Sequence, residues 1–271
     1  MTTDYETLQS CRLVSKQFSR IVTPHAFYLS KITVSSANEL EAFQSHAIFA
    51  ANHPSFAKYV KYLIIAGDGL EDELEKKFEE HACVSWKQIW GIIRYLHNLH
   101  GLTLKRLQFK NEDLSVYGVS LKEHITEVLP QTLPRLVRLQ LEELSFALNP
   151  SGVRSAAAVI NPLPLFSSPT LTQLHLHNVN FFTKGQGICV CPYQFSNVCI
   201  RSPNFHSLRV VRLIKGIRCL KLWDGDNGEV PKYLNRMVIN NKATLETLVL
   251  GIDMRDAGMS NFNLFAQFAN L

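Results

Sequence analysis

One short apolar pattern recurs along this chain of 271 residues and restricts its fold more than any other feature. Each copy has an aliphatic residue, two variable residues, an apolar residue, one variable residue and a second apolar residue. The clearest copies are LVRLQL, which begins at Leu136, and LTQLHL, which begins at Leu171; others are LKRLQF, LRVVRL, IRCLKL, LETLVL and the weaker VKYLII. The intervals are irregular, and IRCLKL follows LRVVRL too closely to be a full repeat. Such recurrence predicts a stack of similar units.

The end of each copy has the pattern of a β-strand. Its last two apolar residues are two positions apart, so both point to one face of the strand. The residue between them points to the opposite face and is polar in most copies, which predicts that this face is in contact with water. These intervening residues are Gln108, Gln140, His175, Arg212, Lys221 and Val249.

The segments between the copies predict helical crossovers, because parallel strands need connections of a dozen or more residues. Ser85 is a suitable N-cap for a helix that ends with Gly101 as its C-cap. Another helical stripe ends before Pro130. A third helix begins near Pro231 and has Leu234 on its apolar side.

These elements predict an α/β fold. We expect an irregular leucine-rich-repeat solenoid of short parallel strands and helical crossovers over residues 31–271, preceded by small helices over residues 1–30. The chain ends in FNLFAQFANL, which is apolar to its last residue. Since a solenoid needs a polar cap at its end, we expect the array to be truncated there or to be capped by another chain.

The first thirty residues follow a different pattern. Ser15 is a suitable cap for a helix that carries Phe18, Ile21 and Val22 on one face, and Thr23 followed by Pro24 predicts a new helix start. The segment LQSCRLVSKQFSRIVTPHAF resembles the second half of an F-box, as found in fungal-type F-box proteins with the pattern L-x-x-CRLVSK-x-F-x-x-I-x-x-P. The stretch HPSFAKYVKYLIIAG is similar to the segment that leads those proteins into their first repeat strand.

The resemblance implies a substrate receptor that recruits a protein to a Skp–cullin–RING ubiquitin ligase. It places the contact with the Skp-type adaptor on Leu8, Leu13, Val14 and Phe18; core packing of the short helices is the equal alternative for these four residues. The first helix of the family's F-box, with its Leu-Pro start, has no counterpart here, so the F-box is expected to be incomplete at its N-terminus. The alternative function is a repeat scaffold that binds a protein partner without any role in a ubiquitin ligase.

The water-facing side of the strands is the candidate surface for an unknown protein substrate. The residues expected to contact it are Gln140, His175, Arg212 and Lys221. Basic residues beside these strands either form a positive strip for an acidic or phosphorylated protein segment, or keep the sheet soluble.

Two groups of side chains have some resemblance to metal sites. His175 and His177 share one strand face, with His206 as a possible third ligand. Cys189, Cys191 and Cys199 do not have a standard zinc spacing. Structural roles are favoured for both groups, so we expect neither a metal nor another cofactor.

Composition excludes several classes of protein. No apolar run reaches the roughly 18 residues of a membrane span, and the start lacks the layout of a secretory signal, so we expect an intracellular protein, cytoplasmic or nuclear, with reduced cysteines. The net charge of +5 is too small to indicate nucleic-acid binding. The sequence has neither a G-x-S-x-G motif nor a phosphate loop. We therefore expect no enzymatic activity, although a hydrolase without a recognisable motif remains a second alternative.

Overall fold

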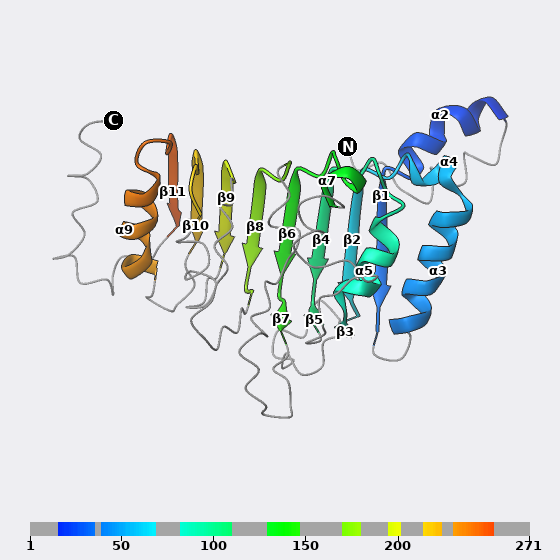
Figure 1. The fold of residues 1–271 in the computed structure, drawn as a ribbon, viewed down its shortest axis with the longest axis horizontal. Coiled ribbons are helices and arrows are strands. Elements are labelled where there is room, and N and C mark those ends of the chain that lie inside the picture. The colour runs from blue at the N-terminus through cyan, green and yellow to red at the C-terminus, as the bar shows by residue number, and fades with distance from the viewer. Residues whose placement is uncertain are drawn as a thin grey trace.

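Eight strands pair in parallel to form one open sheet in the order β1-β2-β4-β6-β8-β9-β10-β11 (Figure 1). The computed structural model describes residues 16–35, 39–68, 82–109, 129–146, 170–179, 195–201, 214–223 and 230–251. The strands of the sheet are β1 (Leu29–Val34), β2 (Tyr62–Gly67), β4 (Gly101–Lys105), β6 (Arg138–Glu142), β8 (Gln173–His177), β9 (Asn197–Arg201), β10 (Cys219–Trp223) and β11 (Thr247–Gly251). The chain is thus a mixed α/β protein.

Alternation within the strands separates a buried face from a water-facing one. From β4 to β10, the second and fourth residues of every strand are buried and lie in register across the sheet, whereas the third residues are more exposed. The buried residues are Leu102, Leu104, Leu139, Leu141, Leu174, Leu176, Val198, Ile200, Leu220 and Leu222. Burying one such side chain contributes roughly 1.5–3 kcal/mol relative to exposing it, so these two rows hold the strands together.

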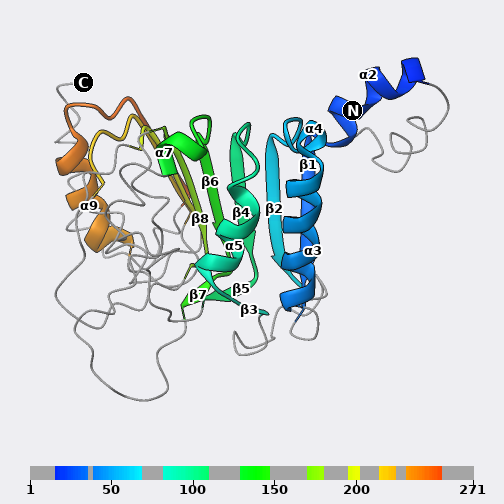
Figure 2. The same ribbon diagram turned by 45° about the vertical axis from the view of Figure 1, so that its right-hand side comes forward.

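Helices cover the buried face. They are α3 (Glu39–Asn52), α4 (Pro54–Ala57), α5 (Trp86–Ile93), α7 (Leu129–Thr132) and α9 (Val230–Asn241). Ile89 and Ile93 of α5 and Leu234 and Met237 of α9 belong to the same hydrophobic core as the two strand rows. The remaining helix, α2 (Lys16–Ala26), lies beyond β1 and points away from the sheet (Figures 1 and 2).

Buried polar contacts fix two of these helices. The Ser85 Oγ accepts a hydrogen bond from the Gln88 backbone N–H at 3.2 Å, and the Gln88 Oε1 accepts one from the Ser85 N–H at 2.7 Å. This capping box confirms the predicted start of α5. The buried Asn241 at the end of α9 accepts from the Ile217 N–H at 3.0 Å and donates to the carbonyls of Ile214 and Met237. The end of α9 is thereby tied to the segment that enters β10.

A repeated corner ends three successive strands. Arg106, Glu143 and Asn178 directly follow β4, β6 and β8, and all three have left-handed backbones, with φ of 53°, 50° and 46°. The backbone N–H of each donates to the carbonyl of the last residue of the next strand of the sheet. After the first two corners the chain enters a smaller parallel sheet, β3-β5-β7, formed by β3 (Ala82–Val84), β5 (Leu107–Phe109) and β7 (Ser145–Phe146).

This corner explains why the predicted register of LKRLQF is wrong. The strand of the large sheet in this region is β4, which buries Leu102 and Leu104, whereas Leu107 lies in β5 of the smaller sheet. Consequently Thr103, and not Gln108, is the neighbour of Gln140. The left-handed turn at Arg106 divides the apparent copy between two sheets.

The C-terminal half of the sheet contains two strands, β9 and β10, that the repeat pattern does not predict as full repeats. IRCLKL supplies β10, which is a full member of the sheet, and β9 lies between β8 and β10. None of the copies of the repeat pattern coincides with β9. The copy LRVVRL, including Arg212, lies outside the described residues.

Three predicted helix ends differ from the structure. Helix α5 ends at Ile93, and Gly101 instead begins β4, where a Cβ would lie only 2.6 Å from the Tyr62 ring. Pro130 lies within α7. Helix α2 continues through Pro24 without a new start. Among the residues that the structure describes, no helix is both long and apolar enough to cross a membrane.

Candidate functional site

The water-facing side of β6, β8, β9 and β10 brings together residues that are far apart in the sequence. In register, Gln140 pairs with His175, His175 with Cys199, and Cys199 with Lys221, so these four form one row across the sheet. Three of the four residues expected to contact a partner are therefore close together. The fourth, Arg212, lies outside the described part of the chain.

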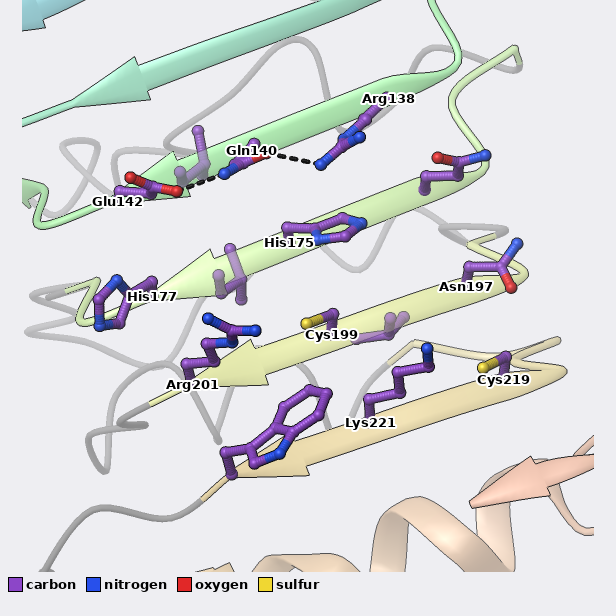
Figure 3. A pocket seen from close by; sticks show the side chains of 15 residues that line it. Arg138, Gln140, Glu142, His175, His177, Asn197, Cys199, Arg201, Cys219 and Lys221 are labelled. Carbon is purple, nitrogen blue, oxygen red and sulfur yellow. Dashed lines mark hydrogen bonds between the residues drawn. The ribbon is translucent and has the colours of Figure 1, made fainter. Parts of the chain in front are cut away.

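This row crosses an open hollow of about 560 Å³ (Figure 3). Arg138 lies at one end of β6, and Arg201 lies at the end of β9. Both line the hollow together with the row. We call the residues Arg138, Gln140, His175, Cys199, Arg201 and Lys221 the cationic face.

A chain of hydrogen bonds runs along β6 at one side of the hollow. The Arg138 Nη2 donates to the Gln140 Oε1 at 2.8 Å, and the Gln140 Nε2 donates to the Glu142 Oε1. The other carboxylate oxygen of Glu142 lies 3.6 Å from the Lys105 Nζ. Glu142, the acidic residue of the hollow, is thus already engaged by neighbours on its own face. Among the described residues, no carboxylate lies within ion-pair distance of Arg201 or Lys221.

Stacking holds Arg201 at the opposite side of the hollow. Its guanidinium carbon lies 5.2 Å from the centre of the Trp223 ring, a cation–π arrangement. The indole in turn covers Gly251 on β11, where a Cβ would lie 2.9 Å from the indole Nε1 and even closer to Cδ1. Glycine at this position therefore leaves room for the ring that contacts the guanidinium.

The charges of this face change the acid–base properties of its two central residues. Burial lowers the pKa of His175, the positive charges of Arg138, Arg201 and Lys221 lower it further, and Glu142 partly opposes them. Because the ordinary histidine pKa is about 6.5, His175 is neutral at pH 7 and offers one N–H donor. Burial also raises the pKa of the Cys199 thiol, although the same three cations oppose this shift. Cys199 is therefore a protonated thiol at neutral pH rather than an activated nucleophile.

The metal alternatives gain no support from the described residues. His175 and His177 do share one face of β8, but no group of three or more His, Cys, Asp or Glu side chains in the described ranges is arranged to hold a metal ion. Cys199 is a half-buried free thiol. The other candidate ligands, Cys189, Cys191 and His206, lie outside those ranges.

The candidate adaptor contacts belong mainly to undescribed parts of the chain. Leu8, Leu13 and Val14 lie outside the described residues, and Phe18 lies on α2 without a description of its side chain. On the same helix, Val22 is buried, whereas Ile21 is 62% exposed. Of these two residues, only Val22 packs against the rest of the described chain.

A second hollow of about 690 Å³ lies beside β1, between the sheet edge and helices α3 and α4. It is lined mostly by apolar side chains, among them Phe27, Leu29, Phe49 and Phe56. The rings of Phe27 and Phe56 are 4.9 Å apart. Ile48, on α3, is 60% exposed. We call these five residues the apolar edge.

Sequence reasoning missed Arg201 and Trp223 as parts of the site. Both have a detectable signal, since Val198 and Ile200 alternate in NVCIR as a half-buried strand does. Trp223 lies two residues after Lys221 and hence on the same face. No family model matches the chain, and no curated protein matches it.

Proposed function

We propose that this chain is a non-enzymatic, protein-binding receptor whose cationic face binds an acidic segment of a partner protein. The observation that carries the proposal is that Arg138, Arg201 and Lys221 line one open hollow, and that among the described residues around it the one carboxylate, Glu142, is already engaged. Hydrogen bonds from charged donors to carboxylates are among the strong polar contacts of proteins. An extended acidic segment that lies across the strands would meet all three cations.

The arrangement favours binding over chemistry. Cys199 is a protonated thiol at neutral pH, so it is not activated for nucleophilic attack. In contrast, Arg138 is held by Gln140 and Arg201 by Trp223, so both cations are positioned before a ligand arrives. Positioned donors lose less freedom on binding and therefore bind more tightly.

We further propose that the large sheet is an irregular leucine-rich-repeat-like array. Its parallel strands share one register, and most of them begin in the same manner. The carbonyl just before one strand accepts hydrogen bonds from the N–H groups of two consecutive residues at the start of the next strand of the sheet. The acceptors of this kind are Tyr28, Lys61, His100, Val137, Ser196 and Arg218. Such repetition of one local structure supports descent from a repeated unit, and arrays of this kind often bind partners on the strand face.

The wider role that we propose is substrate recruitment to a Skp–cullin–RING ubiquitin ligase. The support is the F-box resemblance of residues 8–24 together with helix α2, which leaves Ile21 exposed at the far end of the molecule from α9 (Figure 1). Leu8, Leu13, Val14 and Phe18 would then contact the adaptor. The alternative is a scaffold that binds the same acidic partner without a ligase.

Two experiments test these roles separately. The full chain is first titrated with a panel of fluorescent 15-residue peptides of graded acidity. We expect retention of the acidic peptides, and loss of binding in the variant R138Q/R201Q/K221M but not in the matched variant R20Q/R236Q/K242M, which removes exposed charges from the helices and the end of α9. Equal binding by both variants would refute the cationic face as the site.

The ligase role is tested by co-expression with a Skp-type adaptor. Co-purification that is lost when Leu13 and Phe18 are changed to Glu supports it. Its absence would leave the scaffold alternative, and acidic-peptide binding would be unaffected by that result.

A further inference from the structure

We infer that the cationic face recognises a phosphate monoester, carried by a phosphorylated serine or threonine of the partner segment. This inference rests on the proposed function and names the ligand group that the hollow selects. It is carried by the charge of the hollow, by the positions of its donors and by the small residue between them.

The charge of the hollow matches a dianion better than a single carboxylate. Its described lining includes three cations, Arg138, Arg201 and Lys221, and one carboxylate, Glu142, which leaves an excess of two positive charges while His175 is neutral. A phosphate monoester carries about −1.5 to −2 charges at pH 7, whereas a carboxylate carries one. A phosphorylated side chain thus neutralises the excess with one group.

The donors surround one position on the sheet. Cys199 lies on β9 with His175 on one neighbouring strand and Lys221 on the other, and Arg201 is two residues further along on the same face. Figure 3 shows the Arg201 and Lys221 side chains on either side of Cys199. Since neighbouring strands are about 4.8 Å apart, His175 and Lys221 lie on strands separated by roughly 10 Å, with a small thiol between them.

This geometry suits a tetrahedral group. Arg201, Lys221 and His175 line the same hollow, on β9 itself and on the two strands beside it. The terminal oxygens of a phosphate ester can accept hydrogen bonds from all three kinds of donor. A carboxylate has only two oxygens in one plane, so it cannot serve three such donors equally well. The stacked Trp223 keeps the Arg201 fork beside this space.

The half-buried Cys199 provides the readout, because a ligand above it should block its alkylation. The full chain is treated with iodoacetamide, and the rate of modification at Cys199 is followed by mass spectrometry. The reaction contains increasing amounts of N-acetyl-phosphoserine N-methylamide, the glutamate diamide of the same form, or inorganic phosphate. Because the cations affect the pKa of Cys199, protection is compared only within each variant.

We expect half-protection by the phosphoserine probe at a concentration at least about tenfold below that of the glutamate probe. Lys221→Met and Arg201→Gln should each raise that concentration about tenfold, whereas Lys242→Met, at an exposed position beyond α9, should not change it. Lys221→Arg, which keeps the charge, should retain most of the protection.

Three outcomes would overturn the inference. Equal protection by the glutamate and phosphoserine probes would show that a carboxylate suffices. Protection by inorganic phosphate but not by the ester would indicate a free anion. Failure of all three probes, while acidic peptides still bind the wild type and not the R138Q/R201Q/K221M variant, would overturn the phosphate inference and leave the proposed function intact.

Discussion

The hollow at the cationic face and the hollow at the apolar edge have similar sizes, about 560 and 690 Å³, but opposite chemistry. The cationic face lies on the water-facing side of β6, β8, β9 and β10, whereas the apolar hollow lies where α3 and α4 meet the edge strand β1. The comparison teaches that the middle of the sheet presents polar side chains of its strands, while its first edge presents apolar side chains of strand and helices together.

Buried residues below both regions should therefore contribute similarly to the free energy of unfolding. Leu174 lies on β8, beneath the cationic face, and Ile65 lies on β2, next to the edge strand β1, and both have 0% exposure. Replacing either with Ala should lower the free energy of unfolding by about 2–5 kcal/mol, because a cavity remains in a packed core. Urea unfolding followed by circular dichroism measures this loss.

The control for this prediction is His175→Ala, the substitution next to Leu174 on the opposite face. It should lower the free energy of unfolding by less than about 1 kcal/mol, because the side chain is half-buried and lies on the water-facing side of β8. A larger loss of unfolding free energy for His175→Ala than for Leu174→Ala would contradict the assignment of the buried and water-facing sides of β8.

Binding should differ between the regions where stability does not. Arg201→Gln should weaken an acidic peptide from the panel about tenfold, because it removes one charged donor from the cationic face. A matched change at the apolar edge, Phe49→Gln, should leave that affinity unchanged. Fluorescence anisotropy on both variants makes the comparison, and equal weakening would contradict the separation of the two regions.

A smaller effect is expected at the residue that supports Arg201. Trp223→Ala removes the stacked ring and should weaken the same peptide roughly two- to fivefold, as expected for the loss of one cation–π contact. Trp223→Phe, which keeps an aromatic ring, should restore most of the affinity. A loss in both variants that matches Arg201→Gln would mean that the indole contacts the peptide itself.

The smallest expected effect is on the pH dependence of stability, through His175 on the cationic face. The pKa of His175 is lower in the folded chain than its ordinary 6.5, so the unfolded chain takes up the proton first as the pH falls. His175 therefore contributes stability above pH 6.5 that is lost as the pH falls toward its folded pKa. Urea unfolding of the wild type should show this loss, and His175→Gln should show less of it; identical pH profiles would count against the shift.

The parts of the fold that the sequence predicted are those where local pattern and tertiary structure agree. The strands β6 and β8, with Leu139, Leu141, Leu174 and Leu176 buried, have the expected period, and the Ser85 cap begins α5 as expected. These features depend on side chains two to four residues apart, which a sequence displays directly.

The parts that failed depend on long-range contacts. Arg106 has a left-handed backbone but is not a glycine, the residue that usually marks such a turn. Nothing in LKRLQF therefore shows where one sheet ends and the next begins. Strand β9 has few leucines, and its position between β8 and β10 decides that Lys221 lies two strands from His175. The sequence therefore identified single members of the site, but not the hollow that Arg201 and Trp223 complete.

Reversing one charge tests the binding role of the cationic face most directly. An acidic peptide that binds the wild type is titrated onto Lys221→Glu and onto Lys242→Glu, an equal change of charge at an exposed position outside the hollow. We predict that Lys221→Glu abolishes measurable binding and that Lys242→Glu retains the wild-type affinity. Equal affinities in the two variants would show that net charge, and not the hollow formed by β6, β8, β9 and β10, attracts the peptide.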